Sequence, residues 1–470
     1  GATSINGLSD GTTPATGNIG LGTGAVDSIT TGDYNVGLGD DALTATTSGH
    51  SNTANGYKAL AANTTANNNT AIGRHSLLTN TTGADNTAVG RDSMRMNLTG
   101  SSNVGIGYET LYANTTGAYN VALGALALDA NTTGARNTAT GHSALTANTT
   151  GNYNTASGFD TLKANTTGTG NVAIGRDSLM TNTTASNNTA VGYASLQLNT
   201  TGYHNTAVGK SALEDNTTGY YNAAFGYHAL KLNTTGLQNS AFGYEALYSN
   251  TSGNYNIALG ITALGANTTG NNNVGIGKLA LTNNTTASDN TAVGYRSLAA
   301  NTTGAGATAV GRDSLYSNTT GTFNTAVGKY ALWANTTASS NTAVGYDSLQ
   351  GNTTGANNTG FGRDALRVNT TGAQNVAVGF EALKAHTTSN DCVAVGYQSQ
   401  LATTTGTNNT SLGMGSLRTI TTQSGNTAIG TASQYISAAA NNTSVGFESL
   451  RYNTTGSVNT AVGKDSLKTN

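Results

Sequence analysis

One five-residue string, N-T-A-V-G, recurs along the chain at a constant spacing, and this periodicity limits the possible folds more than any other feature. The closing glycine of each copy falls every 17 residues from Gly22 to Gly430, over 25 copies. Two further copies end at Gly446, after 16 residues, and at Gly463, after 17, which gives 27 repeats. Self-similarity at a fixed period is typical of architectures in which each unit packs only on its neighbours.

The consensus repeat reads N-T-A-V-G-x-x-S-L-x-x-N-T-T-G-x-x. We number repeat positions from the closing glycine as position 0. The leucine is then at position 4, the N-T-T-G corner occupies positions 7 to 10, and the N-T-A-V segment occupies positions 13 to 16. The asparagine at position 13 is replaced only at Ala307 and Cys392.

Seventeen residues are too few for a helix pair, because helical repeats need about 33–34 residues. Glycine, threonine and valine also disfavour helix. The N-T-A-V segment alternates like a short strand, and S-L-x-x is a second candidate strand. Asparagine and glycine in the corner tolerate positive φ and close turns. The sequence therefore predicts an all-β parallel β-solenoid, with coils about 4.8 Å apart and a rod of about 130 Å.

Composition excludes several other classes of protein. Of 470 residues only 9% are charged, the net charge is −2, and there are 62 glycines but only 1 proline. Glycine does not fall at every third residue, which excludes collagen, and no stretch approaches the roughly 20 apolar residues of a membrane span. The near-neutral charge indicates no nucleic-acid partner. We expect no membrane insertion, and a single cysteine allows no intramolecular disulfide.

Two apolar columns follow from the repeat. Small residues at positions 3 and 15 suit the narrow interior of a 17-residue coil, which leaves the columns at positions 16 and 4. If either column faces outward it forms a long apolar stripe, which marks an interface, and a homotrimer would bury it. If both point inward, the rod is a monomer. We predict an interface column at position 16 that includes Val191, Val208, Phe225 and Phe242.

Position 1 carries recurring tyrosines and charges. Exposed aromatic rows can stack on sugar rings, or they can pack against another subunit. The predicted receptor or glycan contacts are Tyr193, Tyr227, Tyr244, Tyr295 and Tyr346. The Arg-Asp dipeptides that recur at positions 1 and 2 form either a solvated edge or ion pairs between coils or subunits.

The sequence indicates no catalytic, cofactor-binding or metal site. No two of the six histidines are 17 residues apart, so none would be neighbours on adjacent coils. His386 and Cys392 are interpreted as a corner substitution and an inert small residue. Two acidic pairs share a column, Asp160 with Asp177 and Asp347 with Asp364, but they belong to the repeating charged edge. We therefore expect no enzymatic activity and no cofactor.

The strings N-T-A-V-G-R-D-S at 86–93 and N-V-A-I-G-R-D-S at 171–178 resemble the head repeats of trimeric autotransporter adhesins, which carry the pattern N-S-V-A-I-G-x-x-S. That resemblance implies a left-handed parallel β-roll trimer. The longer repeat, with its N-T-T-G corner, is similar to the shaft repeats of phage tail fibres. It implies a structural, non-catalytic fibre of a phage or virus that attaches to a host surface, located on a virion appendage, outside the cell or at its surface.

We expect three regions: a connector or cap over 1–17, a regular shaft over 18–430, and less regular coils over 431–470. The chain ends in mid-repeat, so we expect it to belong to a longer polypeptide. A bacterial surface adhesin or extracellular filament subunit is the main alternative. A carbohydrate-active solenoid enzyme and an ice-binding protein are further alternatives, although two adjacent corner threonines cannot both lie on one flat strand face.

Overall fold

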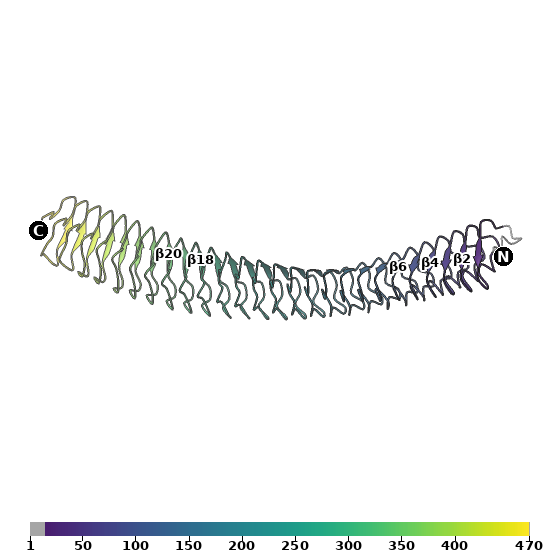
Figure 1. Ribbon diagram of the computed structural model, residues 1–470. Coiled ribbons are helices and arrows are strands. Elements are labelled where there is room, and N and C mark those ends of the chain that lie inside the picture. Colours follow the sequence, from purple (N-terminus) through teal and green to yellow (C-terminus); the bar gives the residue numbers. More distant parts are fainter. Residues whose placement is uncertain (1–14, 470) are drawn as a thin grey trace, which may run out of the picture. The chain divides into compact units, whose positions relative to one another are not determined.

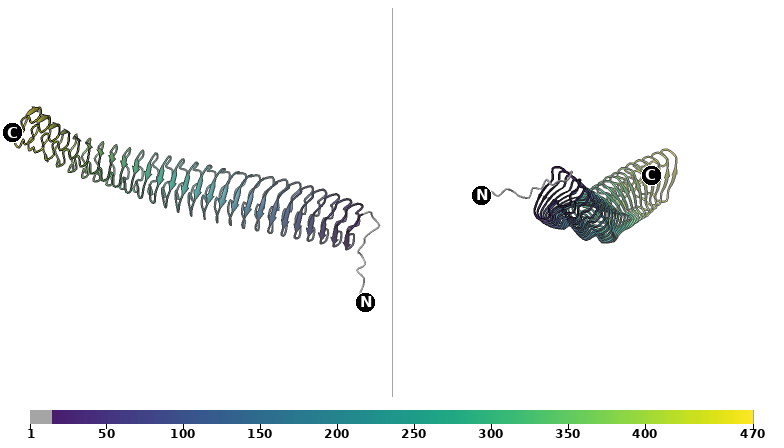
Figure 2. Two further views of the ribbon diagram at one scale, coloured as in Figure 1. Left: turned by 90° about the horizontal axis from the view of Figure 1, so that it is seen from above. Right: turned by 90° about the vertical axis from the view of Figure 1, so that its right-hand side faces the viewer.

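The computed structural model describes residues 15–469, in two compact units that divide after Leu237. Each unit is a parallel β-solenoid with one three-residue strand per 17-residue repeat, and the described residues contain no helix. Figures 1 and 2 show the strands lying side by side in each unit. The predicted fold class is therefore confirmed. Most of the predicted cap, residues 1–14, lies outside the described residues.

The strands are the T-A-V segments of the repeat. The first unit contains β1 (Ile19–Leu21), β2 (Val36–Leu38), β3 (Thr53–Asn55), β4 (Thr70–Ile72), β5 (Thr87–Val89), β6 (Val104–Ile106), β7 (Val121–Leu123), β8 (Thr138–Thr140), β9 (Thr155–Ser157), β10 (Val172–Ile174), β11 (Thr189–Val191), β12 (Thr206–Val208) and β13 (Ala223–Phe225).

The second unit contains β14 (Ser240–Phe242), β15 (Ile257–Leu259), β16 (Val274–Ile276), β17 (Thr291–Val293), β18 (Thr308–Val310), β19 (Thr325–Val327), β20 (Thr342–Val344), β21 (Thr359–Phe361), β22 (Val376–Val378), β23 (Val393–Val395), β24 (Thr410–Leu412), β25 (Thr427–Ile429), β26 (Thr443–Val445) and β27 (Thr460–Val462).

Strands pair in register at equal repeat positions, so that Ala190 lies opposite Ala207. The 16-residue repeat keeps this register, with Ala428 opposite Ser444. Because the strand and the asparagine before it are retained, the corner between β25 and β26 absorbs the missing residue.

The interior of each coil is filled by the small residues and the leucine. Along β12, Ala207 is buried, whereas Thr206 and Val208 on either side point outward and are half-buried. Leu213, at position 4 of the next coil, is fully buried. The prediction of a narrow interior is confirmed. Of the two apolar columns, position 4 points inward and position 16 points outward.

The predicted second strand, S-L-x-x, is wrong, because the structure has a turn there. In the coil after β12, both Ser211 and Leu213 have positive φ, 54° and 52°. Left-handed backbone costs a non-glycine residue about 1–2 kcal/mol. Burying the leucine side chain contributes about 1.5–3 kcal/mol, so burial offsets the cost of the turn.

The closing glycine is required by close approach of neighbouring coils. Gly209 has a φ of 134°, and a Cβ on it would lie 2.4 Å from the carbonyl oxygen of Gly226. Only glycine combines this φ with this contact. This explains why position 0 is glycine in every repeat.

A ladder of buried asparagines at position 13 links one coil to the next. The backbone N–H of Asn103 donates to Oδ1 of Asn86 at 3.0 Å, and Nδ2 of Asn103 donates to the carbonyl of Gly117 at 2.9 Å. Each asparagine therefore bonds to the coils before and after it. Buried amides remain stable only when they are bonded in this way.

The N-T-T-G corner holds a second ladder. Nδ2 of Asn97 donates to Oδ1 of Asn80 at 2.7 Å and to the carbonyl of Gly100, within its own corner, at 2.9 Å. Asn97 and Gly100 do not have positive φ. The expectation that the corner needs Asn and Gly for their backbone freedom is therefore wrong, because the asparagine is there for its side-chain hydrogen bonds.

Threonine at position 8 completes the corner. The carbonyl of Thr132 accepts hydrogen bonds from the backbone N–H groups of Thr115, Thr116 and Gly117, at 2.9, 3.2 and 3.4 Å, and from the Thr115 hydroxyl at 3.0 Å. One carbonyl oxygen thus receives four donors from the preceding coil, so corner and strand both hold adjacent coils together.

The ladders break at a few residues. Ala307 offers no side-chain oxygen to the N–H of Asn324. Cys392 substitutes its thiol, and Sγ donates to the carbonyl of Gly406 at 3.2 Å. His386 takes a position-7 place, which leaves the buried Oδ1 of Asn369 without a hydrogen-bond partner.

We expect Ala307→Asn to raise the stability of the second unit by about 1 kcal/mol, the net value of a typical buried hydrogen bond. The new Oδ1 would accept from the N–H of Asn324, and the new Nδ2 would donate to the carbonyl of Gly321. Urea unfolding followed by circular dichroism measures the change. Ala305→Asn, on the half-buried outer surface, serves as the control. Equal unfolding midpoints for both variants would contradict the role of the ladder.

Stability of the second unit should fall in mild acid because of His386. Burial lowers the pKa of this imidazole in the folded protein, and its Nε2–H donates to the carbonyl of Ser389. The folded state therefore favours the neutral ring, whereas the unfolded chain takes up a proton below its pKa of about 6.5. Stability is complete above that pH and decreases by up to about 1.4 kcal/mol per pH unit below it, until the folded pKa is reached.

The measurement is the urea midpoint between pH 7.5 and pH 5. His386→Asn should weaken the pH dependence. It should also raise stability at pH 7.5, because its Nδ2 can donate to Oδ1 of Asn369. An unchanged pH dependence in this variant would assign the effect to other groups.

Candidate functional site

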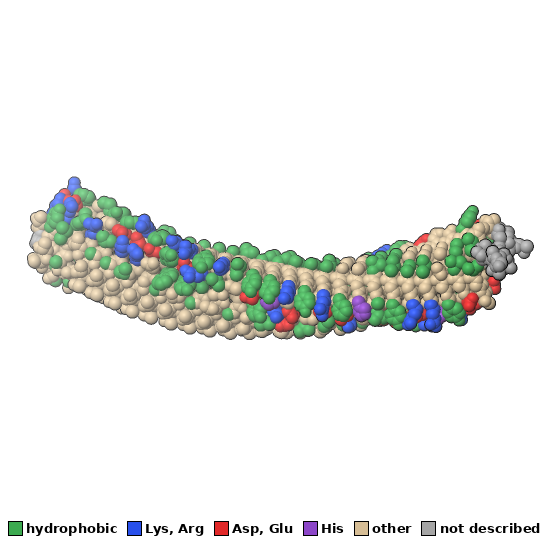
Figure 3. Space-filling view, viewed as in Figure 1, with side chains coloured by type: hydrophobic (Ala, Val, Ile, Leu, Met, Phe, Trp, Pro, Cys, Tyr) green, Lys and Arg blue, Asp and Glu red, His purple; other side chains and the backbone are tan. Residues whose placement is uncertain are grey.

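The outward face of the strands is the most extended surface feature of both units. Position 16 places one apolar side chain per coil on this face, and we call this row the apolar column. Its members Val191 and Val208 are half-buried, while Phe225 and Phe242 are 36% and 38% exposed. Figure 3 shows rows of hydrophobic side chains along the surface of the units. The predicted interface residues thus face outward, although the structure of one chain does not test what covers them.

Beside the apolar column, position 1 forms a column rich in cations and aromatic rings. The Tyr193 ring has the guanidinium carbon of Arg176 at 6.0 Å and Nζ of Lys210 at 5.9 Å from its centroid. These cations come from the coils on either side, so they lie over opposite faces of the ring. Cation–π contacts of this kind contribute about 0.5–1 kcal/mol at exposed sites.

The other predicted sugar contacts lie in the same column. Tyr346 has Lys329 at 5.8 Å and Arg363 at 5.7 Å, Tyr227 has Lys210 at 5.7 Å, and Tyr295 has Arg312 at 5.8 Å. Tyr244 is 48% exposed. Because cations occupy the ring faces of Tyr193 and Tyr346, these residues turn mainly ring edges and hydroxyls to solvent. Stacking on a sugar requires a free ring face, so the geometry favours a structural column.

The charged dipeptides form ion pairs both within and between coils. The Asp313 side chain is fully buried and lies 3.1 Å from Nε of Arg312 and 2.8 Å from Nε of Arg296, on the preceding coil. Arg312 is 55% exposed. At this dipeptide the arginine is solvated and the aspartate is not.

A second pairing escaped the sequence analysis: an acid at position 2 faces a cation at position 5 of the same coil. Examples are Asp92 with Arg95 at 3.5 Å and Asp364 with Arg367 at 3.6 Å. The spacing of three residues between opposite charges was the available signal. It was missed because S-L-x-x was interpreted as a strand, in which positions 2 and 5 would point to opposite sides.

The candidate catalytic acids are held in these pairs. Arg367 lies 3.8 Å from Asp347 and 3.6 Å from Asp364, so one guanidinium serves both carboxylates. Burial raises the pKa of Asp347 despite this cation. Asp177 pairs with Arg176 at 3.1 Å, and Asp160 with Lys163 at 3.0 Å. These contacts are those of a repeating structural edge.

Cys392 and His386 occupy interior places of the same coil, at positions 13 and 7. Burial raises the pKa of the Cys392 thiol to about 11, so it stays protonated at neutral pH. Within residues 15–469 no group of three histidine, cysteine or acidic side chains is placed to hold a metal ion. In the same range no helix is long and apolar enough to cross a membrane.

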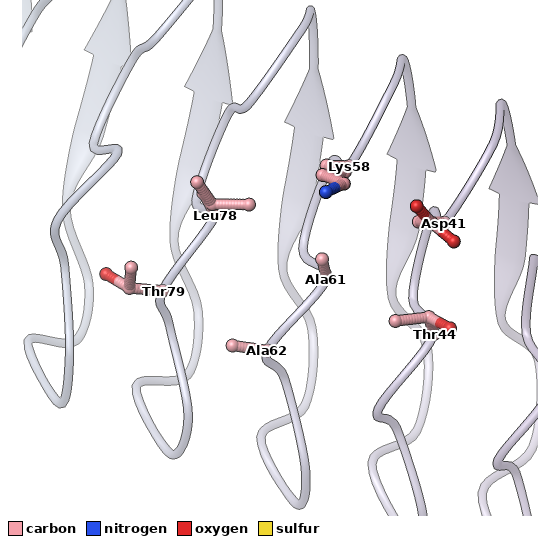
Figure 4. A pocket seen from close by; sticks show the side chains of 7 residues that line it. All are labelled: Asp41, Thr44, Lys58, Ala61, Ala62, Leu78 and Thr79. Atoms are coloured by element: carbon pink, nitrogen blue, oxygen red, sulfur yellow. The ribbon is translucent and has the colours of Figure 1, made fainter.

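A shallow surface hollow lies over the coils that follow β2, β3 and β4, with a volume of about 480 Å³. Figure 4 shows Asp41 and Lys58 on neighbouring coils, with the small side chains of Ala61 and Ala62 next to them. Its lining carries one carboxylate and one amine, on neighbouring coils.

The structure thus presents two surface columns side by side, one apolar and one rich in cations and aromatic rings. Comparison of the chain with known protein families and with curated proteins finds no match.

Proposed function

We propose that the protein is the structural, non-catalytic shaft of a fibre, most closely matched by the tail fibre or related appendage of a phage or virus, and that it attaches to a host surface. The observation that carries this proposal is the outward apolar column on a solenoid whose coils are joined at both strand and corner. A body of this kind resists bending, and it gains one more equivalent interface with each repeat.

The apolar column supports self-association. Large side chains on it, such as Ile106, Phe242 and Phe361, are 43%, 38% and 54% exposed in the single chain. A contiguous apolar stripe of this kind marks an interface in soluble proteins. A homotrimer, which the resemblance to adhesin head repeats implies, would bury three such columns along one axis.

A bacterial surface adhesin or extracellular filament subunit shares this architecture and remains the alternative. An ice-binding role has less support, because the hydroxyls of Thr115 and its equivalents at position 8 donate hydrogen bonds to the next coil. Of the two corner threonines, only the one at position 9 then faces solvent freely. A carbohydrate-active enzyme is disfavoured because the paired acids are bound to cations.

The solution mass, measured by light scattering together with negative-stain images of the same sample, tests the proposal. A mass of three chains on an elongated particle supports the trimeric shaft. A monomeric particle at micromolar concentration contradicts self-association through the apolar column.

Val208→Asp is expected to weaken the trimer, so that it dissociates at a higher concentration than the unmodified protein, and to leave the coil folded. The side chain faces outward, so in the monomer the new carboxylate is solvated, whereas in the trimer it would be buried without a partner, at a cost of several kcal/mol. Sedimentation velocity measures the mass, and circular dichroism the fold. Thr201→Asp, at the exposed corner position of the same coil, should leave the trimer intact. If the two variants dissociate at the same concentration, the contact lies on another face.

A further inference from the structure

A hollow of about 210 Å³ opens on the outer surface of the second unit, where the repeat becomes less regular. It spans the coils that follow β23, β24 and β25. Its lining includes Tyr397, Met414, Gly415, Arg418, Ala432 and Tyr435.

The hollow exists because two successive coils have almost no side chain at position 2. The flanking coils have Gln398 and Glu448 at this position, whereas Gly415 and Ala432 occupy it between them. Gly415 has a φ of 62°, close to the 60° of Asp364 at the equivalent position. Its backbone therefore matches coils that carry an acid, and only the side chain is missing.

The same replacement removes a negative charge. In other coils a position-2 acid pairs with the position-5 cation, as Asp364 does with Arg367 at 3.6 Å and Glu448 does with Arg451. In this coil position 5 is Arg418, and position 2 is Gly415. Arg418 makes no ion pair with any residue in 15–469. An arginine without its usual carboxylate thus stands at the edge of a hollow.

Contacts around Arg418 hold its guanidinium in place and leave one edge open. Nε donates to Oε1 of Gln398 at 3.2 Å, and Nη1 donates to the hydroxyl of Tyr435, over whose ring the guanidinium carbon lies 5.4 Å from the centroid. Nη2 donates to no described residue. An oriented guanidinium with free N–H groups recognises a carboxylate by paired hydrogen bonds.

Aromatic and apolar surface completes the site. Tyr397 is 51% exposed and Met414 56%. The ring of Phe380, on the preceding coil, stacks on Tyr397 with centroids 5.3 Å apart. The opposite face of Tyr397 points toward Met414, the position-1 residue of the next coil, so the two side chains form one apolar surface in the lining. Unlike Tyr193 and Tyr346, this ring has no cation over that face.

We propose that this hollow binds one acidic sugar unit of a surface polysaccharide, with the sugar carboxylate on Arg418 and the ring against Tyr397 and Met414. The volume is below the roughly 300–1,000 Å³ of pockets that enclose drug-sized ligands, so it suits a single ring. A lone guanidinium matches one carboxylate, whereas a polyanion such as nucleic acid requires an extended basic surface.

This inference rests on the proposed attachment role and names the chemistry that the shaft would recognise. It concerns the side of the shaft and does not use the apolar column. The proposed trimeric shaft, tested by the solution mass, and the proposed sugar site, tested by the affinity, can therefore fail independently. A trimer that does not bind the sugar overturns only the sugar site.

The experiment is calorimetric titration of the full chain with tetragalacturonate and with its methyl ester, which keeps the ring and removes the charge. We expect the acid to bind at least tenfold more tightly than the ester. Equal affinities, or no binding of the acid at millimolar concentration, would overturn the proposal. Displacement of the acid by an equal concentration of acetate would also overturn it, because the site would then recognise a free carboxylate only.

Two variants remove the site in different ways. Arg418→Gln removes the charge, and Gly415→Asp fills the hollow and restores the acid–cation pair found in other coils. Each should weaken binding of the acid at least tenfold. A Cβ at Gly415 would lie 3.2 Å from a ring carbon of the half-exposed Tyr435, which a small shift of that ring accommodates. Thermal unfolding followed by circular dichroism checks that both variants fold.

Arg367→Gln is the matched control, because Arg367 occupies position 5 in a coil that retains its acid. It should leave binding unchanged. Loss of binding in this control to the same degree as in Arg418→Gln would indicate a general charge effect and overturn the assignment. Unchanged binding of the acid by Gly415→Asp would also overturn the assignment.

Discussion

The hydrogen bonding of each coil to its neighbours is the constraint on which the rest of the structure depends. The strand of a repeat is only three residues long, as in β12 (Thr206–Val208), and such a strand alone would not hold a solenoid together. Two buried asparagine ladders and the four-donor carbonyl at position 8 add the missing links. Each coil is consequently fixed at the strand, before the strand and at the corner.

This hydrogen bonding restricts the residue types at the interior positions of the repeat and leaves those at the outer positions free to vary. Positions 0, 4, 7, 13 and 15 are set by close backbone approach, burial or amide bonding. Positions 1, 5, 11 and 12 face outward and carry the tyrosines and arginines, whereas position 2 carries acids such as Asp313 that are buried against the arginines. Residues that break the interior rule, such as His386 and Cys392, still bond to neighbouring carbonyls. The interior therefore tolerates exchange of one donor for another more readily than loss of the donor.

The role of a residue at an outer position depends on its neighbours on adjacent coils. A tyrosine at position 1 is a sugar-stacking candidate when considered alone, but between Arg176 and Lys210 it becomes part of a column whose ring faces are covered. Conversely, Gly415 appears in the sequence as one more substitution. In the structure it lines a hollow together with Ala432 and Arg418, and the charge of Arg418 has no acid at position 2 to pair with. In the proposed fibre the regular columns would serve assembly, and the place where they are interrupted is the candidate for recognition.

The period, the solenoid class, the N-T-A-V strand and the small interior residues follow from the sequence alone, because a 17-residue repeat without helix formers has few other ways to bury its apolar side chains. It could not decide which apolar column points inward. That depends on the positive φ at Ser211 and Leu213, which turns the leucine into the interior and converts an expected strand into a turn. The role of the corner asparagines and the pairing of positions 2 and 5 were likewise decided by tertiary structure, since both arise only when that turn places side chains of the same and neighbouring coils in contact.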